Sequence, residues 1–587
     1  MKNFKKIMAM IIAMVMIVGT MSVSALAAPG DLSVNSKLKI TGLDKGDTVT
    51  YYQILKWDPD NSIKDEDGNP IGWVWGDDIK FESTLIDADL LKIVGTTDGS
   101  GEIDSELAGK IAANVVGGKA TAKLEGTEWT QTVEDAGLYM AIVDPATAGT
   151  IYNPIFVAAN WYGAGEDPDT SNEFGVIPNS KSYSDNSMAK KTTIPLDKTA
   201  KGKDKEDGVT NNKLADGAYT TDVGEEIDFE VATHVPKYAD NYKDPVFSLT
   251  DTLQGLALTG DNVKVYKAVE GEATVLLDSS YYKITGSAAN STTYTVSFNK
   301  EYMQGDDIPV NGQDVIIKYT AKVTDAAVKV VNQDKNTVDL KFSTNPDDTT
   351  GAGLLRDQTN HFTFSIDANL LGHDEIEGSS TEAIKVGIDA EGNYVVEESS
   401  YAWSNSTHGP LEGAQFKLYK DEACTQLYSN DVFDGSVTSD ASGRLTIKGL
   451  DAGTYYLKEE KAPAGYIKMQ EVVEVVITAD IEEEVKVEEE VNAAGETVEV
   501  TYYTNKLKGY TVTIGGETTT YTIENSKVTA QSADRVAPSS DKELANTKGV
   551  ELPSTGGIGT TIFYIIGAIL VIGAGIVLVT RRRMSAN

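Results

Sequence analysis

The stretch VIIKYTAKV at residues 315–323 is rich in the β-branched and aromatic residues that favour extended strands. The runs YTVSF at 294–298 and YTVTI at 510–514 have the same character, and clusters of Gly, Asn and Asp separate such runs. Two glycines directly after the last run are typical of a hairpin turn. Only residues 102–116 suggest a short amphipathic helix. The sequence therefore predicts an all-β protein built of tandem β-sandwiches.

The first 27 residues have the pattern of a cleaved secretory signal peptide. Lys2, Lys5 and Lys6 precede an apolar stretch over 7–21, and Ala-Leu-Ala at 25–27 fits the A-x-A cleavage pattern. We therefore expect cleavage after Ala27 and a secreted mature chain.

Three features follow one another at the C-terminus: Leu552-Pro553-Ser554-Thr555-Gly556, an apolar run over 561–580, and three arginines at 581–583. At about 1.5 Å per residue such a run can span a hydrocarbon core, and arginines resist translocation. The arrangement resembles the cell-wall sorting signal of Gram-positive surface proteins. In that family a sortase cuts between Thr and Gly of LPxTG and joins the Thr carboxyl to an amine. An ordinary C-terminal membrane anchor is the alternative.

Charge and cysteine content narrow the classes of function. The formal net charge is −38, and the two ends that processing would remove carry cationic residues but no acidic ones. A mature chain with this large negative charge repels nucleic acid and anionic membranes, so we expect neither as a partner. The single cysteine, Cys424, cannot form an internal disulfide, so a secreted body of this length needs another source of stability.

The length of the mature chain predicts three or four domains. We expect an N-terminal domain at 28–190, a middle immunoglobulin-like domain at 192–360 and a third domain at 361–530. A linker at 531–551 would present the sorting motif at 552–556, which precedes the transmembrane segment at 561–580 and the basic tail at 581–587.

The third domain contains a motif with expected chemistry. Residues 455–466 (YYLKEEKAPAGY) match the YxLxExxAPxGY "E-box" of the Cna-B-type domains of Gram-positive pilins, and residues 411–419 (LEGAQFKLY) resemble an early strand of that family. In the family the E-box glutamate, here Glu459, promotes a spontaneous amide bond between a lysine and an asparagine. The resemblance implies Lys385 and Asn525 as that pair.

The residue types suit this reaction. An ammonium cannot attack a carboxamide, and burial in an apolar core lowers the pKa of a lysine so that its amine is neutral. A buried carboxyl group can relay protons while it polarises the amide. The resulting crosslink would restrict the unfolded chain as a disulfide does, without depending on redox conditions.

The middle domain resembles the middle domain of the same backbone pilins at residues 194–198, 247–253 and 336–346. This resemblance implies a bond between Lys198 and Asn336, with Asp251 as the acid. Asn332 and Asn345 are alternatives for the amide.

The N-terminal domain does not share this apparatus at the position that can be compared. Its Asp-Ala-Gly-Leu-Tyr at 135–139 echoes Asp-Ala-Gly-Thr-Tyr at 451–455 in the third domain. The alignment of the two echoes places Val143 where Glu459 stands. No E-box bond is predicted there.

Polymerisation requires an acceptor lysine. In backbone pilins it precedes the bonding lysine of the middle domain by seven or eight residues within a YPKN-like motif, which implies Lys190 or Lys191 here, although the Tyr-Pro is absent. The sequence thus predicts the major shaft subunit of a covalent, cell-wall-anchored pilus that supports surface adhesion, with further copies, minor pilins, a class C-type pilin sortase, a housekeeping sortase and peptidoglycan as partners. The alternative is a monomeric wall-anchored adhesin or a basal or minor pilin. We expect neither enzymatic activity nor a cofactor, and the four scattered histidines do not suggest a metal site.

Overall fold

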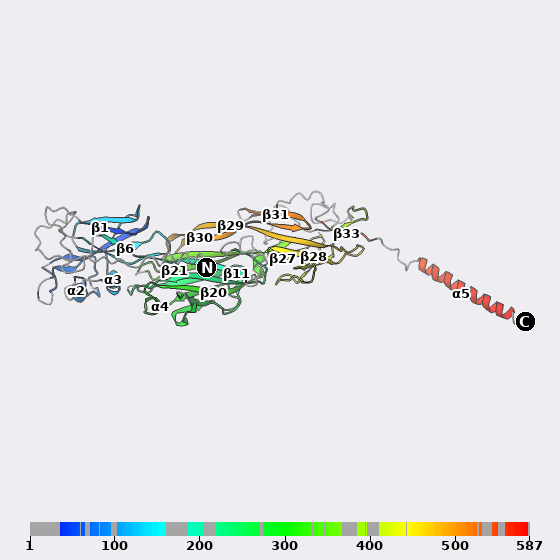
Figure 1. Ribbon diagram of the computed structural model, residues 1–587, viewed down its shortest axis with the longest axis horizontal. Helices are drawn as coiled ribbons and strands as arrows, with labels where there is room; N and C mark the ends of the chain where they lie inside the picture. The colour runs from blue at the N-terminus through cyan, green and yellow to red at the C-terminus, as the bar shows by residue number, and fades with distance from the viewer. Residues whose placement is uncertain are drawn as a thin grey trace.

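The computed structural model describes residues 36–159, 186–202, 218–366, 384–395, 410–524, 527–530, 543–549 and 558–584, apart from gaps at 59, 65–67, 69–70, 82, 95–102, 136, 241, 270–273, 330–333, 346–347, 394 and 442. Three β-rich bodies lie end to end, and a helix follows them at the C-terminal end (Figure 1). The all-β prediction is confirmed. The expected signal peptide and sorting motif lie outside the described residues.

The N-terminal domain combines two small sheets and the strand pair β7–β10 with two short helices. One sheet has the order β5-β1-β9, and the other has the order β3-β2-β6-β8 with β4 added to β2. Apolar residues of both helices pack in one core with β2 and β6. The elements are β1 (Ser36–Thr41), β2 (Thr48–Trp57), β3 (Trp73–Trp75), α2 (Asp87–Val94), α3 (Ser105–Ala112), β4 (Lys119–Ala120), β5 (Glu128–Val133), β6 (Gly137–Asp144), β7 (Thr150–Tyr152), β8 (Ile155–Ala159), β9 (Asn186–Met188) and β10 (Lys191–Thr193).

The helix expected at 102–116 is observed as the shorter α3. The Asp104 carboxylate accepts a hydrogen bond from the Leu107 N–H at the start of this helix. Such a cap satisfies an N–H group that has no partner within the helix. The described helix therefore begins at Ser105.

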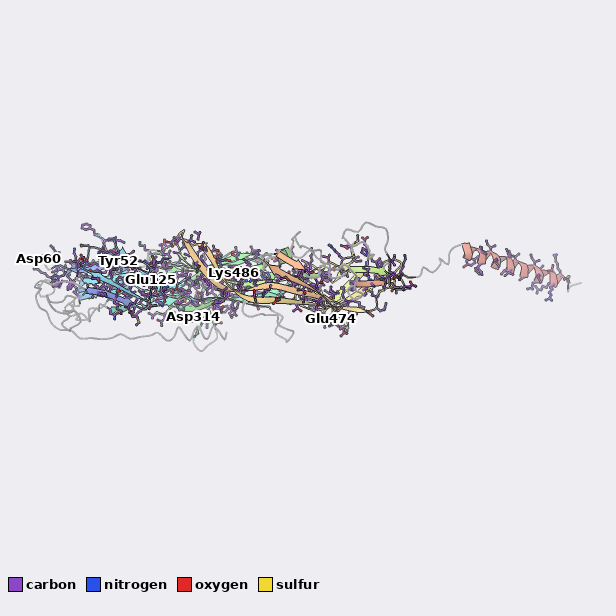
Figure 2. The ribbon with its side chains drawn as sticks, turned by 90° about the horizontal axis from the view of Figure 1, so that it is seen from above. Tyr52, Asp60, Glu125, Asp314, Glu474 and Lys486 are labelled. Atoms are coloured by element: carbon purple, nitrogen blue, oxygen red, sulfur yellow. The ribbon has the colours of Figure 1, made fainter. Side chains whose placement is uncertain are left out.

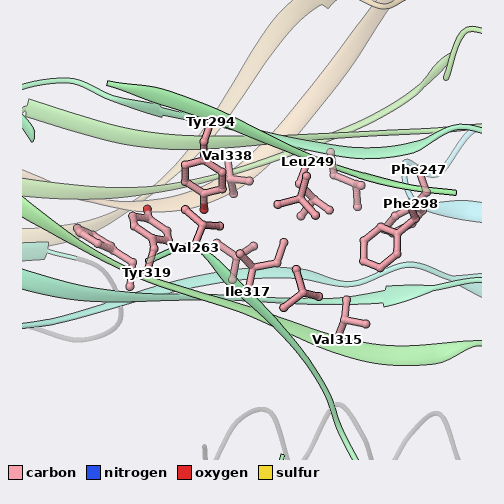
Figure 3. Close-up of a cluster of buried hydrophobic side chains, with 14 of the residues drawn as sticks. Phe247, Leu249, Val263, Tyr294, Phe298, Val315, Ile317, Tyr319 and Val338 are labelled. Atoms are coloured by element: carbon pink, nitrogen blue, oxygen red, sulfur yellow. The ribbon is translucent and has the colours of Figure 1, made fainter. Parts of the chain in front are cut away.

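The middle domain is a sandwich of two six-stranded sheets, β11-β13-β20-β16-β17 with β15 on β20, and β12-β22-β21-β14-β19-β18. Alternate residues of β14, β20 and β21 face the shared core, part of which is drawn in Figure 3. The elements are β11 (Leu196–Gly202), β12 (Ala218–Thr220), β13 (Glu226–Val235), β14 (Phe247–Leu253), β15 (Leu256–Leu258), β16 (Lys264–Lys267), β17 (Val275–Leu276), η1 (Ser279–Tyr281), β18 (Tyr282–Thr285), β19 (Thr293–Phe298), α4 (Lys300–Gln304), β20 (Gln313–Val323), η2 (Asp325–Lys329), β21 (Asp334–Phe342) and β22 (Gly353–Phe362).

The C-terminal domain is built on a seven-stranded sheet with the order β26-β25-β28-β29-β30-β31-β32. Two strand pairs complete it, β23 with β27 and β24 with β33. The predicted hairpin turn after residue 514 is confirmed, since Ile514 pairs with Glu517 across two glycines of positive φ. The elements are β23 (Phe364–Ile366), β24 (Ile384–Ile388), β25 (Gln415–Tyr419), β26 (Ser436–Thr438), β27 (Ile447–Leu450), β28 (Gly453–Lys461), β29 (Val472–Val491), β30 (Thr497–Ile514), β31 (Glu517–Glu524), β32 (Lys527–Ala530) and β33 (Glu543–Thr547).

The structure corrects the expected linker at 531–551. Within it, β33 pairs in parallel with β24, the first strand after residue 383, in the register Lys385↔Leu544 and Gly387↔Asn546. Leu544 and Asn546 are both buried. Because a strand with buried side chains must pack against its domain, the folded C-terminal domain reaches at least Thr547.

The C-terminal helix α5 (Ile558–Met584) carries the expected apolar segment. Residues Ile562–Met584 are long and apolar enough to cross a membrane, with a mean hydropathy of 2.8. Arg581, Arg582 and Arg583 lie in its last turn.

Candidate crosslinking sites

The middle domain brings Lys198, Asp251 and Asn336 together. The Lys198 Nζ donates to Asp251 Oδ1 at 2.5 Å and to Asn336 Oδ1 at 2.8 Å. Asp251 and Asn336 are fully buried, and Lys198 is 2% exposed. The amine therefore touches both the carboxyl group and the amide that the sequence assigned to it.

Strand register explains how these polar groups reach the core. Asp251 continues the inward-facing row that Phe247, Leu249 and Leu253 form along β14. Asn336 likewise continues the inward row of β21, one strand away, opposite Leu253. Side chains alternate between the two faces of a strand, so each group replaces one apolar residue of a continuous stripe.

The surroundings of the amine favour its neutral form. Burial lowers the pKa of Lys198, although the carboxylate of Asp251 opposes this shift. Tyr294 donates its hydroxyl proton to Asp251 Oδ2 at 3.0 Å, and Asn336 Nδ2 donates to the Tyr319 hydroxyl at 2.7 Å. The acid and the amide are thus held in place by the two tyrosines labelled in Figure 3.

The alternatives for the middle-domain amide do not share this position. Asn345 is half-buried in the turn beyond the other end of β21, where its carbonyl accepts a hydrogen bond from the Asp348 N–H. Asn332 lies outside the described residues. Asn336 is therefore the amide that the described structure places on Lys198.

In the C-terminal domain, Glu459 lies between Lys385 and an asparagine that the sequence did not indicate. The Lys385 Nζ is 3.6 Å from Glu459 Oε1, and both side chains are fully buried. Asn546 Nδ2 donates to Glu459 Oε2 at 2.8 Å and to the Ile467 carbonyl at 2.6 Å. The acid thus contacts both potential partners of a bond.

The Lys385 amine is also held at this site by the backbone of β33. It donates to the Leu544 carbonyl at 2.5 Å. Burial lowers the pKa of Lys385 to about 8, against the opposing effect of Glu459. A neutral amine is therefore accessible near physiological pH.

The expected partner of Lys385, Asn525, lies outside the described residues. Its neighbours Glu524 and Lys527 pair at the β31–β32 turn, on the edge of the seven-stranded sheet. Asn546 falls within residues 531–551, which the sequence predicts to be a linker, and the sequence therefore does not indicate it. The alternation of Leu544 and Asn546 in the short run ELANT, just before the sorting motif, is the signal that could have identified it.

The two candidate acceptor lysines lie between the N-terminal and middle domains, and both are exposed. Lys191 pairs with Tyr152 across β10 and β7, and its Nζ is 2.6 Å from Asp44 Oδ2. Within the described residues, the Lys190 side chain makes no hydrogen bond or ion pair. Val143 is buried in β6, so an apolar side chain occupies the position compared with Glu459.

Two segments of the chain match families of known proteins. The SpaA prealbumin-like fold domain matches residues 400–491, and the LPXTG cell wall anchor motif matches residues 545–585. The chain is therefore a secreted, cell-wall-anchored surface protein with a prealbumin-like domain.

The relatives are pilin subunits. The chain is 24% identical to the trypsin-resistant surface T6 protein of Streptococcus pyogenes serotype M6, over 93% of this chain and 95% of the relative. The structure of the T6 backbone pilin of that serotype matches with a TM-score of 0.53 and 17% identity, covering 89% of this chain and all of that one. The major pilin SpaD of Corynebacterium diphtheriae gives a TM-score of 0.39 at 18% identity, over 74% of this chain and 88% of that one.

The resemblance to Gram-positive backbone pilins is thus confirmed. The chain is homologous to a structural pilin subunit along nearly its whole length, rather than to an enzyme.

Proposed function

We propose that this chain is the repeating shaft subunit of a covalent pilus and that two internal amide bonds stabilise it. The observation that carries the proposal is the homology to a backbone pilin over 93% of a chain that ends in a cell wall anchor motif. Two buried clusters of lysine, acid and asparagine support the internal bonds. Three domains, at about 28–193, 194–363 and 364–549, form the mature body.

The internal bonds join Lys198 to Asn336 and Lys385 to Asn546. In each reaction the neutral amine attacks the amide carbon of the asparagine, the new C–N bond forms and the bond to Nδ2 breaks. The buried acid, Asp251 or Glu459, takes the proton from the amine and delivers it to the departing nitrogen, which leaves as ammonia. Each acid acts once, within its own domain.

The polymer forms by a second amide exchange. A class C-type pilin sortase breaks the Thr555–Gly556 bond, holds the acyl group, and transfers it to the ε-amine of Lys190 or Lys191 in the next copy. Such a head-to-tail contact does not close on itself, so repetition gives a fibre. Minor pilins, a housekeeping sortase and peptidoglycan are the further partners that we propose.

Peptide mass spectrometry on wall material that survives boiling in detergent tests this function. We expect a branched peptide that joins the Thr555 carboxyl to a lysine of another copy, in a ladder of high-mass species. Thr555 attached only to peptidoglycan, without a ladder, would instead indicate a monomeric wall-anchored adhesin or basal pilin.

A further inference from the structure

β29 and β30 are much longer than the sheet in which they begin. Pairing of β29 with β28 stops at Ile477, and pairing of β30 with β31 stops at Gly509. The two strands continue together to the pair Val491↔Thr497 at the tip of the hairpin. We call residues 482–506 of this hairpin the strut.

The strut lies along the middle domain. Figure 1 shows the two strands running from the C-terminal domain over β21, and in Figure 2 Lys486 lies far from Glu474 of the same strand. Its strand β30 contacts mainly β22 and, to a smaller extent, β12. The strut therefore spans the junction between the two domains.

One face of β22 receives the strut through alternate residues. Leu354 packs against Val500 and Tyr502 in a separate buried cluster. Further along, Asn360 Nδ2 donates to the Thr504 hydroxyl at 2.6 Å, and Gln358 Nε2 donates to the same hydroxyl at 3.3 Å. Asn360, Gln358 and Thr504 are all buried.

Charged groups complete the contact. Arg356 is paired with Asp339 of its own domain and also donates through Nη1 to Glu490 at 2.5 Å and Glu488 at 3.2 Å. At the tip, Asn492 Nδ2 donates to the Ala352 carbonyl at 3.0 Å. Apolar, neutral polar and ionic contacts thus follow one another along the whole of β22.

The position of β22 gives this contact a mechanical meaning, which rests on the two proposed internal bonds. When the chain is pulled between an acceptor lysine and Thr555, each internal bond would carry the force directly. The chain from Lys198 to Asn336 and the chain from Lys385 to Asn546 would then carry none. Between the two bonds, the force passes through the backbone of residues 336–385, which no crosslink shortens. β22 lies within it.

A second contact between the domains is smaller. Asp222 Oδ1 accepts hydrogen bonds from the Tyr428 hydroxyl at 2.6 Å and from the Asp451 N–H at 2.8 Å. The Val223 N–H also donates to the Gly449 carbonyl, and Lys322 of β20 pairs with Asp431. This contact therefore joins loops of the two domains, whereas the strut runs along β22.

We propose that the strut is a brace that fixes the middle and C-terminal domains as one rigid unit and holds β22 in its sheet under tension. Single-molecule pulling between residues 190 and 555 tests it. One variant lacks residues 482–506, with Ile481 and Leu507, which pair with each other, joined by Asn-Gly as a two-residue turn.

We expect the wild type to resist extension, and the deletion variant to lengthen at lower force in steps of up to about 170 Å, the contour of residues 336–385 at about 3.4 Å each. Tyr502→Ala should lower the opening force as well. Its matched control, Tyr503→Ala on the solvent-facing side of the same strand, should leave that force unchanged; Tyr503 is 64% exposed.

Intact mass separates the two levels of the proposal. If the wild type has the full mass calculated from its sequence and lengthens by whole domains, the internal bonds are refuted. A deletion variant that has lost both ammonia molecules and yet opens at the wild-type force would overturn the brace alone.

Discussion

Replacement of Asn546 by alanine tests the partner of Lys385 directly. The structure places Asn546 against Glu459, whereas the sequence alone indicated Asn525. We expect Asn546→Ala to keep the middle-domain bond and to lose the C-terminal one. Relative to the mass calculated from its sequence, the variant should be lighter by one ammonia, while the wild type and Asn525→Ala should be lighter by two.

The size of the stability loss follows from the length of the loop that the bond would close. Residues 385 and 546 are separated by 161 positions. In the chain-entropy account of crosslinks, a loop of this length contributes about 5 kcal/mol to the free energy of unfolding. The C-terminal domain of Asn546→Ala should therefore unfold far more readily.

Hydrogen exchange at increasing denaturant, followed on peptides of β28, measures this loss within the intact chain. The exchange of N-terminal-domain peptides from β6, whose core contains no residue of the C-terminal domain, provides an internal reference that should not change. The opposite result would be an Asn546→Ala variant lighter by two ammonia molecules and an Asn525→Ala variant lighter by only one. In that case the geometry around Glu459 does not determine the bond, and the assignment of Asn546 is wrong.

Three further expectations concern single groups. Asp251→Asn should leave the middle-domain lysine and asparagine unlinked, so their two tryptic peptides should appear separately at full mass. Linked peptides lighter by one ammonia, as in the wild type, would contradict the proton transfer by Asp251. In the unlinked C-terminal domain, the pKa of Lys385 is lowered from 10.5 to about 8, so the unfolded state binds more protons between these values. Stability should thus rise as pH increases from about 8 to about 10.5, by about 3 kcal/mol, and pH-dependent calorimetry would show a flat profile if the amine were solvated. Of Lys190→Arg and Lys191→Arg, one should abolish the high-mass ladder on immunoblots of wall extracts, and a ladder that persists in the double variant would exclude both acceptors.

Several features of this protein could be predicted from the sequence because they depend on local patterns. β-Branched alternation indicated the strands, and the sorting signal is a contiguous motif. Lys198, Asp251 and Asn336 were assigned together through three short stretches that resemble one family. The structure brings these three residues into contact because each occupies an inward position of its strand.

The tertiary structure decided what local patterns leave open. ELANT at 543–547 is short and flanked by polar residues, so its sequence predicts a linker. In the fold it pairs in parallel with β24, more than 150 residues earlier, and this pairing buries Leu544 and Asn546. The strut is equally ambiguous in sequence, since Glu488 and Glu490 read as a solvated charged face. Only the fold places Arg356 opposite them. Register within a strand is a local property, whereas the choice of partner between distant strands depends on the surfaces that the whole chain must bury.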